Sequence, residues 1–252
     1  MRLDGKKALV TGAGSDGIGR AIARAFAREG ADVAVHYHSK PDVAGALVEE
    51  IEAMGCRAFA IQADLAEAEV ARQTVREAAD RLGGLDIILT AAAVIHRKPI
   101  LEITDAEWDH MAALNVRGTF ACATEAARLM RRAGSGGRII MIGSVVQQIA
   151  LKGQVAYGAG KGAVAQLARG MALELAGDGI TVNVIAPGAT LTDLNRDHLS
   201  DPKVRAGREA AIPVGRLATP EDMCEAAVFL ASPGAAYTTG ITIFVDGGLI
   251  LP

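Results

Sequence analysis

The chain has 252 residues, of which 50% are hydrophobic, and it carries a net charge of −3. A chain of this length and composition can form one α/β domain with a sizeable core. Its scattered basic residues exclude the basic face that a nucleic-acid-binding protein needs. Its longest apolar runs fall far short of the ~20 residues that span a bilayer.

Targeting and cysteine signals favour the cytoplasm. The N-terminus leads straight into a predicted strand, with no signal peptide. Cys56, Cys122 and Cys224 are odd in number and lack metal-ligand spacing, which suits free thiols in a reducing cytosol. We therefore expect a cytoplasmic protein without a metal site, with a small-molecule substrate and with neither nucleic acid nor membrane as partner.

Short β-rich runs alternate with helical stretches along the whole chain. Strands are predicted near residues 7–11, 32–37, 57–62, 85–90, 138–143, 180–186 and 241–245. This alternation predicts an α/β fold with a doubly wound, parallel, seven-stranded sheet and helices on both faces. No linker or composition break divides the chain, so we expect a single domain over residues 1–252.

A glycine-rich turn follows the first predicted strand. Gly12, Gly14, Gly17 and Gly19 lie between that strand and a segment of helical periodicity at 20–28. Glycines let the backbone approach a pyrophosphate, and the free N–H groups at a helix start attract its charge. A tight turn is the simpler alternative, but the position directly after the first strand favours a phosphate site.

The end of the second strand bears on the choice of nucleotide. An acidic residue here would bind a ribose 2′-OH and repel a 2′-phosphate, and the run 35–40 has none. His38, Ser39 or Lys40 could meet the phosphate of NADP, whereas Asp16 in the glycine turn could oppose it. We predict use of NAD or NADP without assigning a preference. His36 and His38 have no third ligand at useful spacing, so a metal site is not predicted.

Asp64 follows the third strand, three residues before Glu67. This spacing predicts a helix N-cap with a capping box.

Tyr157 and Lys161 are four residues apart in a predicted helix, which places them on one face. The lysine charge would favour the phenolate form of the tyrosine. To act as a base at pH 7, Tyr157 needs a pKa about 3 units below its ordinary value, which corresponds to roughly 4 kcal/mol. One exposed lysine cannot supply that, so a partly dry pocket and a second positive charge are needed, such as an oxidised nicotinamide.

Together these segments resemble the short-chain dehydrogenase/reductase superfamily, over nearly the whole chain and in the expected order. Thr11, Gly12, Gly17 and Gly19 match its glycine motif, with one extra residue between Gly12 and Gly17. The run 90–93, Thr-Ala-Ala-Ala, departs from the family's Asn-Asn-Ala-Gly, so side-chain hydrogen bonds from those asparagines are lost. The resemblance implies a Rossmann-type fold and NAD(P)-dependent oxidoreduction of CH–OH groups.

The resemblance also implies four catalytic residues. Tyr157 would take the hydroxyl proton, and Ser144, thirteen residues earlier, would hydrogen-bond the same oxygen. Lys161 would lower the tyrosine pKa and hold the nicotinamide ribose. Asn115 would sit at a helix kink that holds a water in a proton relay.

The remaining implied contacts concern nucleotide and substrate. Asp64 would lie at the adenine ring, a reading that carries the same weight as the helix cap. The cofactor-binding residues implied are Gly12, Ser15, Asp16, Gly17, Ile18, Gly19, His38, Asp64, Leu65, Ala91, Ala92, Tyr157, Lys161, Pro187, Gly188, Thr190 and Thr192. The substrate-binding residues implied are Ser144, Val146, Gln154, Tyr157 and Asn195.

Substrate identity depends on the covering segment, about 190–213. The segments 35–40 and 237–248 look like those of bacterial glucose and other aldose 1-dehydrogenases, so a sugar or sugar derivative is expected. Polar side chains such as Gln154 could bind sugar hydroxyls or could simply be surface residues. The alternative is a 3-oxoacyl-thioester (acyl-carrier-protein) reductase, with Arg97-Lys98 or Arg131-Arg132 as a carrier patch. A more remote alternative is a non-catalytic nucleotide-sensing relative. The family's usual assembly implies a homotetramer.

Overall fold

The computed structural model describes residues 1–251, with the side chain of His198 excepted. Its sheet has seven strands, all parallel, in the order β3-β2-β1-β4-β5-β6-β7. The strands are β1 (Lys7–Thr11), β2 (Asp32–Tyr37), β3 (Ala58–Gln62), β4 (Ile87–Thr90), β5 (Gly137–Ile142), β6 (Ile180–Pro187) and β7 (Thr242–Val245). The predicted fold is confirmed, with strand ends displaced by one or two residues.

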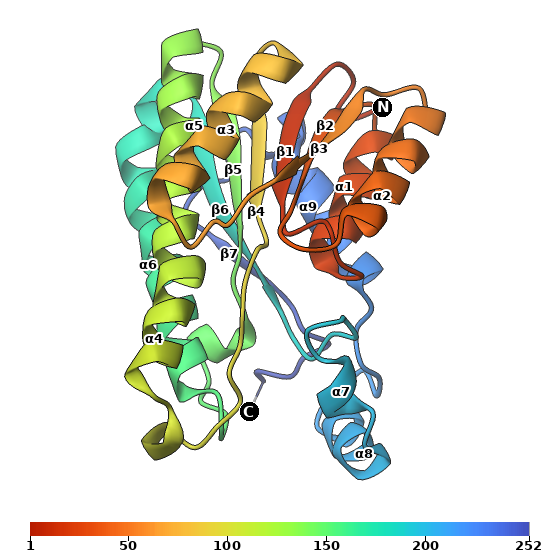
Figure 1. The fold of residues 1–252 in the computed structure, drawn as a ribbon, viewed down its shortest axis with the longest axis vertical. Coiled ribbons are helices and arrows are strands. Elements are labelled where there is room, and N and C mark those ends of the chain that lie inside the picture. The colour runs from red at the N-terminus through yellow and green to blue at the C-terminus, as the bar shows by residue number, and fades with distance from the viewer. Residues whose placement is uncertain (252) are drawn as a thin grey trace.

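Helices cover both faces of the sheet (Figure 1). On one face lie α3 (Ala68–Leu82), α5 (Thr119–Ala133) and α6 (Val155–Leu175), with α4 (Asp105–Ala112) beside α6. On the other lie α1 (Ile18–Arg28), α2 (Pro41–Ala53) and α9 (Cys224–Ala231). Two short helices, α7 (Arg196–Leu199) and α8 (Pro202–Ala210), extend from the carboxyl end of the sheet.

The two-sided core explains the continuous apolar runs of the strands. In β1, Val10 packs in the same cluster as Phe26 of α1, whereas Leu9 packs on the other face with Val75 of α3. Successive side chains of a strand point to opposite faces, so a sheet covered on both sides needs apolar residues at every position. This burial fixes the register of the central strands.

The strand order reverses between β1 and β4. The chain builds β2 and β3 outward on one side of β1, then returns to place β4 through β7 on the other. The connections at the carboxyl ends of β1 and β4 therefore diverge and leave a crevice, which is where open α/β sheets bind ligands. A small cluster containing Leu199, Ile212 and Leu217 packs the segment around α7 and α8 against Leu249.

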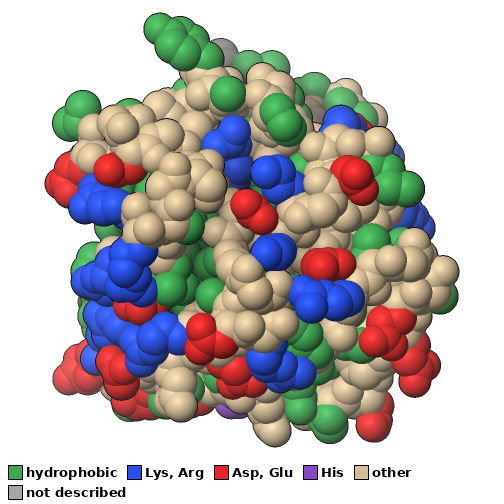
Figure 2. All heavy atoms as spheres, turned by 90° about the horizontal axis from the view of Figure 1, so that it is seen from above, with side chains coloured by type: hydrophobic (Ala, Val, Ile, Leu, Met, Phe, Trp, Pro, Cys, Tyr) green, Lys and Arg blue, Asp and Glu red, His purple; other side chains and the backbone are tan. Residues whose placement is uncertain are grey.

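Basic and acidic side chains lie next to one another on the face seen in Figure 2. Within residues 1–251, no helix combines the length and the hydropathy needed to cross a bilayer. Cys56, Cys122 and Cys224 are free thiols.

Candidate active site

One cavity of about 580 Å³ opens at the carboxyl end of the sheet. The ends of β1, β2, β4, β5 and β6 contribute to it, together with α6 and the segment before α7. Every residue predicted to bind cofactor or substrate lines this cavity, as do three of the four predicted catalytic residues. Asn115 is the fourth, and it is buried beneath the cavity.

The glycine turn fits a nucleotide pyrophosphate. Gly12 has φ +68°, and a Cβ there would lie 2.7 Å from the backbone nitrogen of Ala92. A Cβ at Gly19 would lie 2.6 Å from the carbonyl oxygen of Gly12. Helix α1 begins after Gly17 with no side chain capping its N–H groups, so they are free to bind phosphate oxygens. The chain can therefore pass close to the phosphates, as the glycine motif predicts.

The close approach at Gly12 gives a testable result. Gly12→Ala combines a left-handed backbone with a clash against the segment after β4, so we expect a loss of about 3 kcal/mol in unfolding free energy and weaker nucleotide binding. Gly5→Ala is the matched control, because Gly5 has φ +66° and nothing within 4 Å of an added Cβ. We expect it to cost only about 1–2 kcal/mol. Equal losses in urea unfolding would show that the close approach has no energetic weight.

His36 supports the glycine turn from beneath. Its Nδ1 accepts a hydrogen bond from the Gly12 N–H at 3.1 Å, and its Nε2 lies 3.2 Å from the carbonyl oxygen of Ala63. The proton therefore belongs on Nε2. Burial lowers the pKa of His36 to about 4, so the ring is neutral at pH 7. Sequence reasoning considered His36 only as half of a metal site and missed this structural role.

The neutral His36 predicts acid sensitivity. The unfolded chain takes up a proton near pH 6.5, whereas the folded protein resists until about pH 4, so stability is lost as the pH falls through this window. Between about pH 7.5 and about pH 5 the loss should be about 2 kcal/mol. His36→Asn keeps an acceptor for Gly12 but does not titrate, so urea unfolding should show a smaller loss for this variant. An identical pH dependence in both proteins would contradict the assignment.

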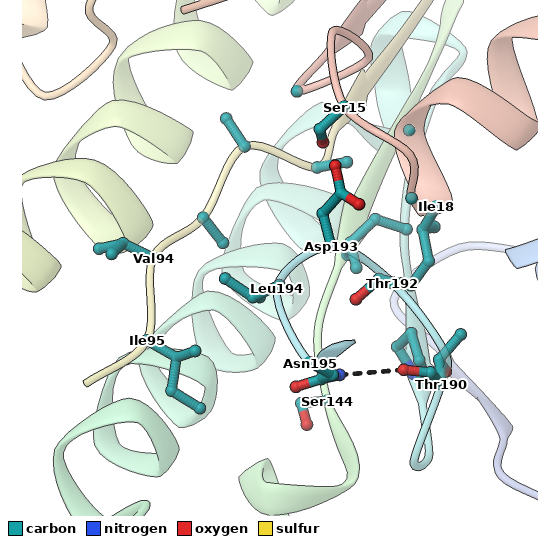
Figure 3. Close-up of a pocket in the computed structure, with 18 of the residues that line it drawn as sticks. Ser15, Ile18, Val94, Ile95, Ser144, Thr190, Thr192, Asp193, Leu194 and Asn195 are labelled. Atoms are coloured by element: carbon teal, nitrogen blue, oxygen red, sulfur yellow. Dashed lines mark hydrogen bonds between the residues drawn. The ribbon is translucent and has the colours of Figure 1, made fainter. Parts of the chain in front are cut away.

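The glycine turn is joined to the covering segment through Asp16, which lies in the stretch that holds the extra residue. The Asp16 N–H donates to Asp193 Oδ2 at 3.2 Å, and the Asp193 N–H donates to the Asp16 carbonyl at 2.9 Å. Figure 3 shows Asp193 extending toward the glycine turn. Arg196 pairs with the Asp16 carboxylate at 3.1 Å, and Lys40 pairs with Asp193 at 2.9 Å. The negative charge expected to oppose a 2′-phosphate thus has a basic partner.

Asp64 does not form the predicted capping box. Helix α3 begins at Ala68 with Glu67 at its N-cap and no side-chain cap. Instead, Asp64 Oδ1 accepts a hydrogen bond from the Ala66 N–H at 2.9 Å, which closes a local turn. The helix-cap reading is wrong because the chain makes this turn before it becomes helical. Asp64 and Leu65 line the cavity, and their contact with adenine stays a prediction.

The side chains of Thr11 and Asn115 hold the backbone of the segment after β4, where the family's asparagines are missing. The hydroxyl of Thr11 accepts hydrogen bonds from the N–H groups of Ala91 and Ala92, at 3.0 and 3.3 Å. Asn115 binds both backbone groups of Val94. Its Oδ1 accepts a hydrogen bond from the Val94 N–H at 2.9 Å, and its Nδ2 donates one to the Val94 carbonyl at 2.8 Å. Asn115 lies in a π-helical turn, Ala113–Gly118, which is the kink that the resemblance implies.

Ser144, Tyr157 and Lys161 line one end of the cavity. Ser144 follows β5, and its Oγ accepts a hydrogen bond from the Val146 N–H at 3.4 Å, which leaves its proton available to a ligand. Lys161 is buried, donates to the carbonyl of Ile142 at 2.7 Å, and lies 5.5 Å from the centre of the Tyr157 ring.

Burial dominates the titration of this pair. It raises the pKa of Tyr157 to about 12 and lowers the pKa of Lys161 to about 8. The expectation that Lys161 lowers the tyrosine pKa is therefore not met, because burial raises this pKa instead. The charge that does lower the pKa of Tyr157 belongs to Arg97.

Sequence reasoning missed Arg97, Arg208 and His110, which also line the cavity. Arg97 was considered only as part of a basic patch for a carrier protein. No spacing rule connects it with Arg208, which lies on α8, more than a hundred residues later. The signal that could have found Arg97 is its position directly after the segment that follows β4, at the ligand-binding edge of the sheet.

Comparisons with known proteins agree with this geometry. A family model described as Enoyl-(Acyl carrier protein) reductase matches residues 12–250. The 3-oxoacyl-acyl-carrier-protein reductase FabG of Staphylococcus aureus is 40% identical over 246 residues, 98% of each chain. An L-rhamnose 1-dehydrogenase (NAD(P)(+)) of a Sphingomonas strain is 38% identical over 98% of this chain and 97% of the relative.

Solved structures show the same likeness. A gluconate 5-dehydrogenase from Burkholderia cenocepacia, in complex with NADP and tartrate, superposes with a TM-score of 0.93. It is 35% identical, over 98% of this chain and 96% of the other. The fold and the cavity thus define an NAD(P)-dependent oxidoreductase acting on CH–OH and carbonyl groups. The chain belongs to the short-chain dehydrogenase/reductase family.

Proposed function

We propose that the protein interconverts a secondary alcohol and a carbonyl on a sugar or sugar derivative, with NAD or NADP as cofactor. The observation that carries this proposal is the position of Ser144, Tyr157 and Lys161 at one end of the cavity, with the glycine turn at the other. The names of two relatives support a sugar, since one is an L-rhamnose 1-dehydrogenase and one a gluconate 5-dehydrogenase.

The residues divide the chemistry as follows. The nicotinamide, when bound, supplies or accepts the hydride. Tyr157 holds its proton at neutral pH, which is the form that donates a proton to a carbonyl oxygen, and Ser144 donates a hydrogen bond to the same oxygen. In the oxidative direction Tyr157 must first lose its proton, so we expect alcohol oxidation to accelerate as the pH rises. We propose that Lys161 contacts the ribose and, once Tyr157 has lost its proton, stabilises the phenolate.

Absorbance of the reduced nicotinamide tests the proposal. Aldoses, deoxy sugars, sugar acids and simple alcohols should be assayed with NAD and NADP in parallel, and a 3-oxoacyl thioester with the reduced cofactors. Oxidation of a sugar or sugar derivative that Tyr157→Phe abolishes is the expected result. Turnover of the thioester alone would overturn the sugar assignment and leave the oxidoreductase class intact.

The thioester reductase is the second candidate, and the 40% identity to the Staphylococcus reductase favours it. The basic patches predicted to bind a carrier protein, Arg97-Lys98 and Arg131-Arg132, have less support from the structure than the reductase activity has from the relatives. Arg97 lines the cavity, and Arg131 pairs with Asp178 at 2.5 Å. A cytoplasmic location is proposed for either function, on the basis of the free thiols and the family.

We also propose that the protein is a homotetramer. An apolar groove runs between α4 and α6, lined by small residues of α6 such as Ala159 and Gly160. Trp108 and Phe120 line the same groove and are 43% and 41% exposed. Large apolar side chains that are exposed together in one groove mark a surface for protein association. Light scattering should give four times the chain mass. A monomer would contradict the proposal.

A further inference from the structure

Two arginines, Arg97 and Arg208, line the cavity, and neither is one of the proposed catalytic residues. We propose that the substrate is an anion, a short hydroxy or oxo acid, and that Arg97 and Arg208 bind its carboxylate. The inference rests on the proposed oxidoreductase function and narrows it to sugar acids and related hydroxy acids.

Arg97 is fixed in position by its neighbours. It reaches from the segment after β4 to the covering segment, where it donates hydrogen bonds to the carbonyl of Leu194 and to the side chain of Asn195. Asn195 in turn donates to the carbonyl of Thr190 at 3.0 Å, a bond drawn in Figure 3. Both bonds of Arg97 are to neutral acceptors. Its Nε is buried and has no hydrogen-bond partner among the described residues.

Arg97 is therefore a half-buried cation, with a buried Nε and without a counter-ion among the described residues. Neither Arg97 nor Arg208 takes part in an ion pair within residues 1–251, His198 aside. The surrounding wall is largely apolar and includes Ile95, Leu199 and Leu249. Desolvation lowers the pKa of Arg97, the charge of Tyr157 partly offsets this, and the charge of Arg208 lowers the pKa again. Two like charges in a partly dry cavity are unfavourable until an anion joins them.

The acidic residues of the cavity lie elsewhere. The acidic residues that line the cavity are Asp16, Asp64 and Asp193, all from segments assigned to the nucleotide end. Asp16 pairs with Arg196 and Asp193 with Lys40. The cavity thus has its carboxylates at the nucleotide end and a positive end for the substrate. A carboxylate suits the positive end because its two oxygens match the planar fork of a guanidinium.

The position of Tyr157 limits the size of the substrate. Arg97 is close enough to this tyrosine for its charge to lower the pKa of the phenol. Arg97 and Tyr157 also line the same cavity of about 580 Å³. A molecule that reacts at Tyr157 while Arg97 holds its carboxylate fits this space best when it is compact, as a hydroxy acid of sugar size is.

The test compares short sugar acids with neutral counterparts in which a CH₂OH group replaces the carboxylate. Binding of each to the enzyme with reduced nucleotide is measured by calorimetry, and turnover by nicotinamide absorbance. We expect the kcat/KM of at least one acid to be about 100-fold higher than that of its neutral counterpart. Arg208→Gln should raise the KM for that acid about 10- to 100-fold and leave the KM for neutral substrates unchanged. Arg97→Gln should weaken the binding of that acid in calorimetry by a similar factor, and Arg97→Lys should restore part of the affinity.

The design separates this inference from the proposed function. Arg208 has no hydrogen bond that the fold needs, so Arg208→Gln remains informative even if Arg97→Gln disturbs the covering segment. Lys152→Gln and Arg205→Gln remove exposed cations outside the cavity and should leave both kinds of substrate unaffected. Turnover of neutral sugars with no preference for acids, and no effect of either arginine, would overturn the anion inference and preserve the oxidoreductase. Failure of every acid to bind would also overturn it, and turnover of the thioester alone would overturn both the anion and the sugar.

Discussion

Replacing Tyr157 with phenylalanine is expected to lower kcat by about 10³-fold and to leave the fold and nucleotide binding intact. Phenylalanine keeps the ring and its packing and removes only the hydroxyl that exchanges a proton with the substrate oxygen. The loss should appear in both directions, because the same group donates the proton in reduction and accepts it in oxidation. Steady-state absorbance kinetics measure the loss, and quenching of protein fluorescence by the reduced nucleotide measures binding.

Tyr237→Phe is the matched control, since Tyr237 is fully exposed and lies outside the cavity. It should retain full activity. A Tyr157→Phe enzyme with more than about a tenth of the normal kcat would contradict the acid/base role, because general acid–base catalysis is worth 10²-fold or more. A variant that also lost nucleotide affinity would show that the hydroxyl positions the cofactor.

Replacing Lys161 with methionine is expected to change activity and stability in opposite directions. Activity should fall by about 10²-fold or more, because the variant loses the ammonium that we propose to hold the ribose and to stabilise the phenolate. Stability should rise, because Lys161 is a buried cation whose only described protein partner is the carbonyl of Ile142. Its pKa falls from 10.5 in a solvated chain to about 8, and at neutral pH holding the charge costs on the order of 3 kcal/mol. After loss of the hydrogen bond, we expect a net gain of about 1–3 kcal/mol.

The pH dependence of unfolding identifies the source of that gain. Between pH 8 and 10.5 the folded protein has released the Lys161 proton and the unfolded chain still holds it, so wild-type stability rises with pH across this interval. The variant lacks this rise, and the difference between the two proteins should therefore shrink above about pH 8. Urea unfolding at neutral and alkaline pH, without nucleotide, makes the comparison. A variant that is less stable at every pH would show that Lys161 is a structural residue.

The fold was predictable because a sheet buried on both faces has a strong local signature. Strands such as β6 are apolar at most positions, and a cluster of glycines marks the turn after β1. The catalytic groups were predictable as candidates because Tyr157 and Lys161 are four residues apart on one helix. Their joint position with Ser144 on one cavity depends on the parallel order of β5 and β6, which the predicted topology already implied.

The features that were not predictable come from contacts between distant segments. Arg97 and Arg208 meet at the cavity only because the covering segment folds back over the carboxyl end of the sheet. The sequence offers His36 only as half of a metal site, but its two ring nitrogens contact backbone groups of two different loops. The tyrosine pKa also depends on burial, which local spacing cannot report. Each of these effects is set by tertiary structure and not by the residues' neighbours in the chain.

The two hydrogen bonds between Asn115 and the Val94 backbone bear on how the substrate specificity of such a protein can change. Because both backbone groups of Val94 are held, the chain before it is fixed relative to the sheet, whereas Arg97 lies only three residues beyond this fixed point. Substitutions from Ile95 onward, and in the facing covering segment, can therefore alter which molecule is accepted without displacing the groups that transfer the proton. One scaffold can in this way give rise to enzymes for many different metabolites by changes in two loops.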